Sequence, residues 1–368
     1  MGVRAIVMLG LALVVSRTAA VQAAKLGPGG RRYRRVSAHH QRSQASATDG
    51  GMVRRLVLWA VAVALAGLAP AAREVPQALS ADAGTLSFAT PGSLDRTETR
   101  YVPGQPITLS GELLVPEGAG PFPVVVLAHG CSGRTVVDRA WAQLVRDWGY
   151  ATFALDSFSG RGLHEVCSDA TVLSGIQRVP DAYGALRRLA SHPRIDTRRA
   201  ALMGFSHGGI LTLNAATVWA KETYAPAGQP AFRAFLPFYP YCNSIYPERD
   251  HVSAPVRIHI GGADDWTPAA SCVSLAASLK AAGYDVAITV YPGAYHGFDN
   301  PWGGGYVRLP FVDNGATCVF RVPSILGPIP SRAEIKACLT KGATIGGDRK
   351  ALEQAQSNVR AQLAELLM

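Results

Sequence analysis

The chain has 368 residues, of which 48% are hydrophobic and 17% charged, and its formal net charge is +10. Residues 1–72 hold ten Lys or Arg and one acidic residue, which leaves 26 basic and 25 acidic residues in the remainder. This near-neutral, apolar remainder is long enough for a globular domain with a large core, and its charge gives no reason to expect a nucleic-acid partner.

The better formed of two candidate targeting segments begins at Met52. Two arginines are followed by an apolar run over 56–68 and by Ala-Pro-Ala-Ala, which ends at residue 72. A charged start, a short apolar run and an A-x-A site are typical of a secretory signal peptide, and the run is shorter than the ~20 residues of a spanning helix. We predict that residues 52–72 are a signal peptide and that residues 1–51 are a non-native, disordered extension. A membrane anchor or a bipartite leader is the alternative.

The remainder, residues 73–368, alternates between strand and helix patterns. Period-two alternation over 84–115 predicts antiparallel strands. Short apolar runs predict buried strands at 124–128, 151–155, 200–205, 232–238, 256–260 and 286–291. Helical periodicity follows at 137–148, 179–190, 269–282 and, N-capped by Asp348, at 348–367. This order predicts a single α/β domain with a mostly parallel central sheet, helices on both faces, and a C-terminal tail and helix.

A serine flanked by glycines follows one of these buried strands. The sequence Gly204-Phe-Ser206-His-Gly208 matches the G-x-S-x-G turn between a strand and a helix, here with a helix expected from Ile210. The sharp turn projects the serine hydroxyl above the sheet, and a Cβ at either glycine would clash with the nearby backbone. Ser206 is therefore the candidate nucleophile.

A serine nucleophile needs a base to accept its proton and an acid to orient that base. In this type of fold the partners follow in the order serine, acid, histidine, each after a strand. Asp264 follows the strand 256–260, and His296 follows the strand 286–291. The spacing favours Asp264 as the orienting carboxylate, and Asp265 remains an alternative at this stage.

Two backbone N–H groups are needed to bind the oxyanion that forms during attack on a carbonyl. We expect one from His207, the residue after the nucleophile. The other is expected from Cys131, in the glycine-rich loop His129-Gly-Cys-Ser-Gly133 after an earlier buried strand. His129 is expected to brace that loop.

Four further side chains are candidates for binding substrate. Arg161 could hold a substrate carboxylate in a bidentate pair, although a surface loop arginine is the commoner role. Trp266, Tyr239 and Tyr295 flank the predicted site and could line a pocket or pack in the core. The sequence shows no clustered His/Cys spacing typical of zinc, and the predicted chemistry needs no metal or cofactor.

The six cysteines all lie in the predicted domain, an even number behind a signal peptide. This pattern favours disulfides and an exported protein, periplasmic or extracellular, although buried free thiols are the alternative. We expect the pairs Cys131–Cys167, Cys242–Cys272 and Cys318–Cys338, because the loops that carry them should meet.

Together these motifs resemble the dienelactone hydrolase family of the α/β-hydrolase superfamily, over residues 107–298. The resemblance implies a triad of Ser206, Asp264 and His296. Founding members have cysteine where this chain has Ser206, which favours a general carboxylesterase that cleaves a small ester or lactone through an acyl-enzyme. An acyltransferase or peptidase on the same fold, and a non-catalytic binding protein, are the alternatives. The tail beyond Gly303 lies outside the resemblance.

Overall fold

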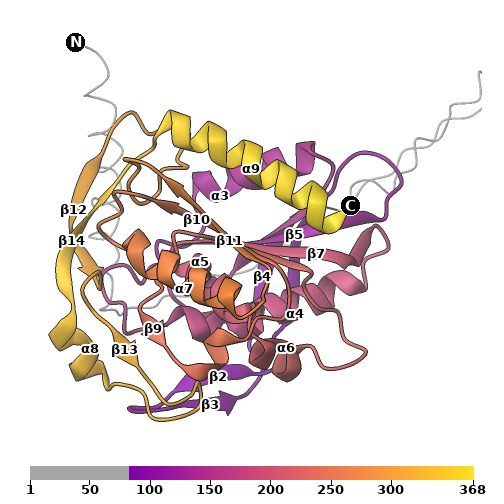
Figure 1. Cartoon of the computed structure of the whole chain (residues 1–368). Coiled ribbons are helices and arrows are strands. Elements are labelled where there is room, and N and C mark those ends of the chain that lie inside the picture. Colours follow the sequence, from indigo (N-terminus) through magenta and orange to yellow (C-terminus); the bar gives the residue numbers. More distant parts are fainter. Residues whose placement is uncertain (1–82) are drawn as a thin grey trace, which may run out of the picture. The chain divides into compact units, whose positions relative to one another are not determined.

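The computed structural model describes residues 83–368, and an eight-stranded sheet runs through them (Figure 1). Across the sheet the order is β1 (Gly84–Ala89), β4 (Thr108–Leu114), β6 (Ala151–Asp156), β5 (Phe122–Ala128), β7 (Ile195–Phe205), β8 (Ala234–Phe238), β10 (Val256–Gly261) and β11 (Val286–Tyr291). The pairs β1–β4 and β4–β6 are antiparallel and the others parallel. The predicted mostly parallel sheet is confirmed. The predictions for residues 1–51 and 52–72 lie outside the described residues.

Helices cover both faces of this sheet, as predicted. Figure 1 shows α3 (Val136–Asp147) and α9 (Arg349–Leu367) on one side, and α4 (Val179–Ala190), α5 (His207–Ala215), α6 (Val218–Tyr224) and α7 (Ala269–Ala281) on the other. Helix α9 buries residues at four-residue spacing, and Asp348 caps it by accepting from the Ala351 N–H. A sheet covered on both faces must be apolar on both, which explains the continuous apolar runs of its strands.

The core lies where β5 and β7 meet at the centre of the sheet. Val124, Val125 and Val126 of β5 are fully buried, as are Ala201 and Leu202 of β7. Because successive strand residues point to opposite faces, such runs fill the space under both helical layers. Parallel strands also place the loops after β5, β7, β10 and β11 at one edge of the sheet, where side chains from distant parts of the sequence meet.

The chain adds short elements around this sheet. A hairpin of β2 (Ser93–Arg96) and β3 (Tyr101–Gly104) precedes β4, and β9 (Ser244–Ile245) follows β8. After β11 the tail forms β12 (Val307–Asn314), β13 (Phe320–Arg321), α8 (Arg332–Cys338) and β14 (Thr340–Ile345). Strand β12 pairs with β14, and β13 pairs with β9. The sequence analysis did not anticipate these tail elements.

Three disulfides join Cys131 to Cys167, Cys242 to Cys272 and Cys318 to Cys338. The predicted pairing is therefore confirmed, although Cys272 and Cys338 lie in helices α7 and α8 rather than in the expected loops. Disulfides persist in oxidising compartments, so these three are compatible with an exported protein. Among the described residues, no helix combines the length and the apolar character needed to cross a membrane.

Candidate active site

Ser206 lies at the sharp turn between β7 and α5. Its backbone has φ 54° and ψ −112°, a conformation that costs a non-glycine residue roughly 1–3 kcal/mol. A Cβ on Gly204 would collide with the Gly208 carbonyl, and one on Gly208 would collide with the Ala128 carbonyl. The flanking glycines are thus required by close backbone approach, as predicted. Helix α5 begins at His207 rather than at the predicted Ile210, because the chain bends at Ser206 itself.

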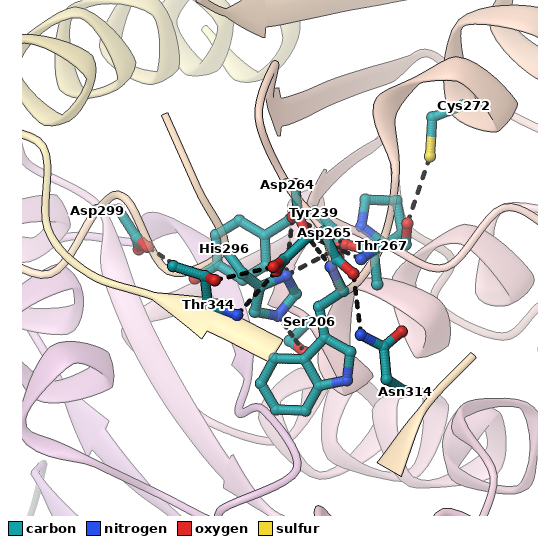
Figure 2. Close-up of polar contacts among 12 residues, drawn as sticks. Ser206, Tyr239, Asp264, Asp265, Thr267, Cys272, His296, Asp299, Asn314 and Thr344 are labelled. Atoms are coloured by element: carbon teal, nitrogen blue, oxygen red, sulfur yellow. Dashed lines mark hydrogen bonds and ion pairs between the residues drawn. The ribbon is translucent and has the colours of Figure 1, made fainter. Parts of the chain in front are cut away.

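The loops after β10 and β11 bring Asp264 and His296 to Ser206 (Figure 2). His296 Nε2 lies 2.8 Å from Ser206 Oγ, and His296 Nδ1 lies 2.8 Å from Asp264 Oδ2. Both partners are almost fully buried, His296 being 4% exposed and Asp264 5% exposed. A carboxylate can only accept, so the Nδ1–H donates to Asp264 and leaves Nε2 to accept the Ser206 hydroxyl proton. The three predicted residues therefore form one hydrogen-bonded chain.

Asp264 is held as a carboxylate by its neighbours. Burial alone would raise its pKa, but His296 and hydrogen bonds to the carboxylate outweigh burial and lower the pKa. The backbone N–H groups of Trp266 and Thr267 donate to its Oδ1 at 2.9 and 2.8 Å, and the Thr267 hydroxyl lies 3.0 Å from its Oδ2. The sequence analysis missed Thr267, although an Asp bonding the backbone two and three residues on is a familiar turn signal.

Asp265 faces away from the imidazole and binds the tail instead. Its carboxylate accepts from the Thr344 backbone N–H at 2.7 Å and from the Thr344 hydroxyl at 2.8 Å. The tail also contacts the histidine loop, where the Gly346 N–H donates to the His296 carbonyl at 3.1 Å. Figure 2 shows Thr344 reaching Asp265 beside His296. Strand β14 therefore ties the aspartate loop to the histidine loop.

The loop after β5 passes directly beside the serine. A Cβ on Gly130 would stand 3.7 Å from the Ser206 Cβ, so this loop packs against the serine, and Cys131 and Ser206 line the same cavity. The Cys131–Cys167 disulfide and a Val166 N–H to Cys131 carbonyl bond of 2.8 Å fix this loop. His207 stands in the first turn of α5, where backbone N–H groups have no partner within the helix. Cys131 and His207, the residues predicted to supply the oxyanion donors, thus both lie close to Ser206, and their role stays a prediction.

A buried arginine, missed in the sequence, connects these two donor segments. Arg178 Nη1 donates to the His129 carbonyl at 3.0 Å and to His207 Nδ1 at 2.8 Å. His207 Nε2 donates to the Leu173 carbonyl at 2.8 Å, so this ring is neutral with Nδ1 as acceptor. Burial first, and then the Arg178 charge, lower the pKa of His207 to about 3. Arg178 precedes Pro180 in an ordinary helix start, and no sequence motif marks its role.

His129 behaves as expected for a bracing residue. Its Nδ1 donates to the Gly130 carbonyl at 2.8 Å, and its Nε2 accepts from the Ser157 N–H at 3.2 Å. Burial and the Arg178 charge lower the pKa of His129 well below its ordinary value, so the ring is neutral. The ring therefore holds the oxyanion loop against the segment that follows β6.

Arg161 does not lie where a substrate carboxylate could use it. Its two terminal nitrogens pair with the two oxygens of buried Asp181, each at 2.8 Å, and Nη1 also donates to the Ser157 carbonyl at 2.7 Å. The bidentate site predicted for a ligand is thus occupied by the protein's own carboxylate. The sequence separation of Arg161 and Asp181 did not predict this ion pair, which joins the segment after β6 to helix α4.

The three aromatic candidates occupy different places. Trp266 lines the cavity beside Ser206, and its ring lies 4.8 Å from that of His296. Tyr239 is buried behind His296 at 4.5 Å between rings, and its hydroxyl donates to Asp299 at 2.7 Å. Tyr295 packs against Tyr306 at 4.6 Å and is not among the lining residues. Of the three, only Trp266 lines this cavity, and Tyr239 packs against the imidazole.

Residues 83–368 contain no group of three or more His, Cys, Asp or Glu side chains arranged to hold a metal ion. The imidazole of His296 and the carboxylate of Asp264 are instead hydrogen-bonded in series with the Ser206 hydroxyl. The arrangement can deprotonate an alcohol and bind an oxyanion with backbone N–H groups.

A mostly parallel sheet that carries serine, aspartate and histidine after three of its parallel strands, here β7, β10 and β11, defines an α/β hydrolase. The chain belongs to the dienelactone hydrolase family, whose model matches residues 109–309. Two relatives bear the provisional name carboxymethylenebutenolidase. The relative from Yersinia pestis is 27% identical to this chain, and the alignment covers 56% of this chain and 79% of the relative. The relative from Methylorubrum extorquens is 23% identical, and the alignment covers 58% of this chain and 75% of the relative.

Solved structures share the fold at lower identity. A protein of Klebsiella pneumoniae subsp. pneumoniae, provisionally described as a dienelactone hydrolase, aligns with a TM-score of 0.50 at 16% identity, covering 76% of this chain and 98% of its own. A dienelactone hydrolase-like promiscuous phosphotriesterase from metagenomic libraries aligns with a TM-score of 0.52 at 17% identity, covering 77% and 100%. These likenesses establish the α/β-hydrolase fold, and family membership makes the protein a hydrolase.

Proposed function

We propose that this hydrolase cleaves a carboxylic ester or lactone through an acyl-enzyme formed on Ser206. The observation that carries the proposal is the continuous hydrogen-bonded chain from Ser206 through His296 to Asp264. In the first step His296 Nε2 takes the hydroxyl proton while Ser206 Oγ bonds to the carbonyl carbon. The Cys131 and His207 N–H groups bind the resulting oxyanion, and Asp264 stabilises the imidazolium.

Collapse of this intermediate breaks the bond between the carbonyl carbon and the alcohol oxygen. The imidazolium gives its proton to that oxygen, so the alcohol leaves neutral and the acyl group stays on Ser206. Water then attacks the acyl carbon, its proton passes to His296 and on to Ser206 Oγ, and the carboxylic acid is released. Every step uses residues of this chain and water.

The proposal is tested with p-nitrophenyl acetate and the variant Ser206→Ala. We expect kcat to fall by several orders of magnitude, because loss of a triad serine removes the nucleophile. An organophosphonate should label wild type on the peptide that contains Ser206 and leave the variant unlabelled. Equal rates for the two proteins would refute the assignment, and far-ultraviolet circular dichroism serves as the control for folding.

We also propose that the protein is exported to the periplasm or the extracellular space. The three disulfides and the signal-like residues 52–72 support this location. N-terminal sequencing of the protein recovered outside the cytoplasm tests it. We expect a start near Arg73, whereas a protein that retains residues 1–51 would contradict the proposal.

A further inference from the structure

A cavity of about 250 Å³ opens beside Ser206. Most of its wall is apolar, and Cys131 and His207, the residues of the proposed oxyanion site, are among those that line it. Its size lies just below the ~300–1,000 Å³ typical of pockets for small ligands. The cavity therefore has room for a substrate group considerably larger than a methyl group.

Much of this wall belongs to the tail. The disulfide Cys318–Cys338 closes a segment, here called the disulfide loop, that contributes Phe320, Val322, Ile325, Ile329, Pro330 and Ile335 to the lining. Phe320 and Ile335 are only half-buried, so their apolar surface faces the cavity rather than the core. A loop that carries several large apolar side chains toward a cavity is suited to an apolar ligand.

Backbone bonds fix the disulfide loop over the site. Its strand β13 pairs with β9, and the Ile329 N–H donates to the Thr99 carbonyl at 2.8 Å. The Tyr241 hydroxyl donates to the Cys318 carbonyl at 2.6 Å. The family model ends at residue 309, so the loop lies beyond the matched region. The family match therefore carries no information about any selectivity that this loop confers.

The position of the cavity indicates which part of an ester enters it. Ser206 and both proposed oxyanion donors line it, whereas His296 is not among the described residues that do so. His296 must reach the leaving oxygen to protonate it, so the alcohol portion lies beside the imidazole. The acyl portion then extends the other way, into the cavity.

We propose that the enzyme selects esters of neutral, apolar acids larger than acetate, and that the disulfide loop sets the upper limit of acyl size. This inference rests on the proposed function. Two lining side chains carry a charge: Asp313 lies 2.6 Å from the Lys341 ammonium, and Arg96 donates to the Pro330 carbonyl at 2.6 Å. The ion pair of Asp313 and the mostly apolar wall favour an uncharged acyl group, whereas Arg96 bonds to a neutral carbonyl and keeps its positive charge.

The test measures kcat/KM for p-nitrophenyl acetate, butyrate, octanoate and hemisuccinate. For wild type we expect butyrate to exceed acetate by about fifteenfold, since butyrate adds two methylenes and each buried methylene contributes roughly fourfold. Hemisuccinate should be poorer than butyrate. A preference for hemisuccinate would assign the cavity to acids with a second carboxylate, with Arg96 as the recognising group, and would overturn the inference.

Two variants change the cavity in opposite directions. Ile335→Trp fills it and should lower the butyrate-to-acetate ratio of kcat/KM at least tenfold, whereas Phe320→Ala enlarges it and should raise the octanoate-to-butyrate ratio. Val319→Trp is the matched control, because Val319 lies in the same loop but is 54% exposed and does not line the cavity. Thermal unfolding checks that each variant is folded.

The outcomes separate this inference from the proposed function. Suppose that all the esters are cleaved in a Ser206-dependent way, but that Ile335→Trp and Phe320→Ala give the same butyrate-to-acetate and octanoate-to-butyrate ratios as Val319→Trp. The inference about the acyl pocket is then wrong, and the proposed function stands. If no ester in the panel is cleaved in a Ser206-dependent way, the proposed function itself fails.

Discussion

Two neighbouring aspartates at the end of β10 have different partners. Asp264 accepts from His296 and from two backbone N–H groups, whereas Asp265 accepts from Thr344. Adjacent residues in a loop point in different directions, so only one of the two carboxylates reaches the imidazole. The pair therefore offers matched variants that differ in a single sequence position.

We expect Asp264→Asn to lower kcat about 10⁴-fold, because an amide at this position favours the wrong imidazole tautomer and leaves the imidazolium unstabilised. Asp265→Asn should stay within about tenfold of wild type and lose stability by about 1 kcal/mol through its weaker bonds to Thr344. Steady-state kinetics and urea unfolding of both variants check this. A larger loss of kcat in Asp265→Asn would contradict the assignment.

Arg178 joins the two segments that supply the proposed oxyanion donors, yet it does not reach the site itself. It is fully buried, and its Nε and Nη2 atoms have no hydrogen-bond partner among residues 83–368. Burial lowers the pKa of this guanidinium to about 10, and the face of Phe158 lies 5.2 Å from it. Unpartnered buried nitrogens are costly, so the position is expected to be held for its bonds to His129 and His207.

Arg178→Met should lower kcat about tenfold to a hundredfold with little change in KM, since a displaced oxyanion donor weakens binding of the transition state and not of the substrate. Loss of the nearby positive charge should also raise the pKa of His207, as followed by NMR titration. Arg178→Lys keeps the charge and should recover part of kcat. A rise in KM at constant kcat would contradict this positioning role.

Disulfides connect elements that the sheet alone does not hold together. Cys131–Cys167 spans 36 residues and fixes the loop after β5, while Cys242–Cys272 spans 30 residues and joins the segment after β8 to α7. Loops of similar length should stabilise the fold by similar amounts. The two bridges differ in that only the first carries a proposed oxyanion donor.

Replacing either pair with alanines should lower the free energy of unfolding by about 2–4 kcal/mol. Only Cys131→Ala with Cys167→Ala should also lower kcat, because the freed loop no longer holds its N–H toward Ser206. Chemical unfolding and acetate hydrolysis, measured below the unfolding temperature of both variants, check this. An equal loss of kcat in the two double variants would show that the effect is general destabilisation.

For the molecule as a whole, buried neutral histidines couple stability to pH. Burial lowers the pKa of His207 to about 3 and that of His259 to about 4, with the Arg178 charge adding to the effect at His207. Both groups titrate near ~6.5 in an unfolded chain. Between these values the unfolded state binds more protons, so these residues make the free energy of unfolding fall as the pH drops below about 6.5.

The variant His207→Gln isolates one of these groups and retains a donor and an acceptor for Leu173 and Arg178. Between roughly pH 5 and 6 we expect its free energy of unfolding to depend on pH less steeply than wild type, by about 1 kcal/mol per pH unit. His259→Gln should show the same change from a separate site. Urea unfolding across this pH range is the measurement, and identical slopes for all three proteins would contradict it.

Local patterns in the sequence were enough to predict the sheet, its covering helices and the positions of Ser206, Asp264 and His296 at the ends of strands β7, β10 and β11. Apolar runs, helical periodicity and the glycines around Ser206 each act within a few residues, so they can be recognised without knowing what lies across the fold. The pair Cys131–Cys167 followed because parallel strands bring the loops at their ends, here those after β5 and β6, to one edge. Cys272 and Cys338 lie instead in helices α7 and α8.

The remaining features depended on contacts between residues far apart in the chain. Asp181 binds Arg161, Thr344 binds Asp265, and Arg178 joins His129 to His207. The tail lines the cavity beside Ser206, and no periodic pattern in its sequence predicted that position. Sequence by itself determined which residues stand at the ends of the strands, because that depends on local backbone preferences. Only the tertiary structure decided which partner each side chain meets, because a hydrogen bond depends on positions in space and not on separation along the chain.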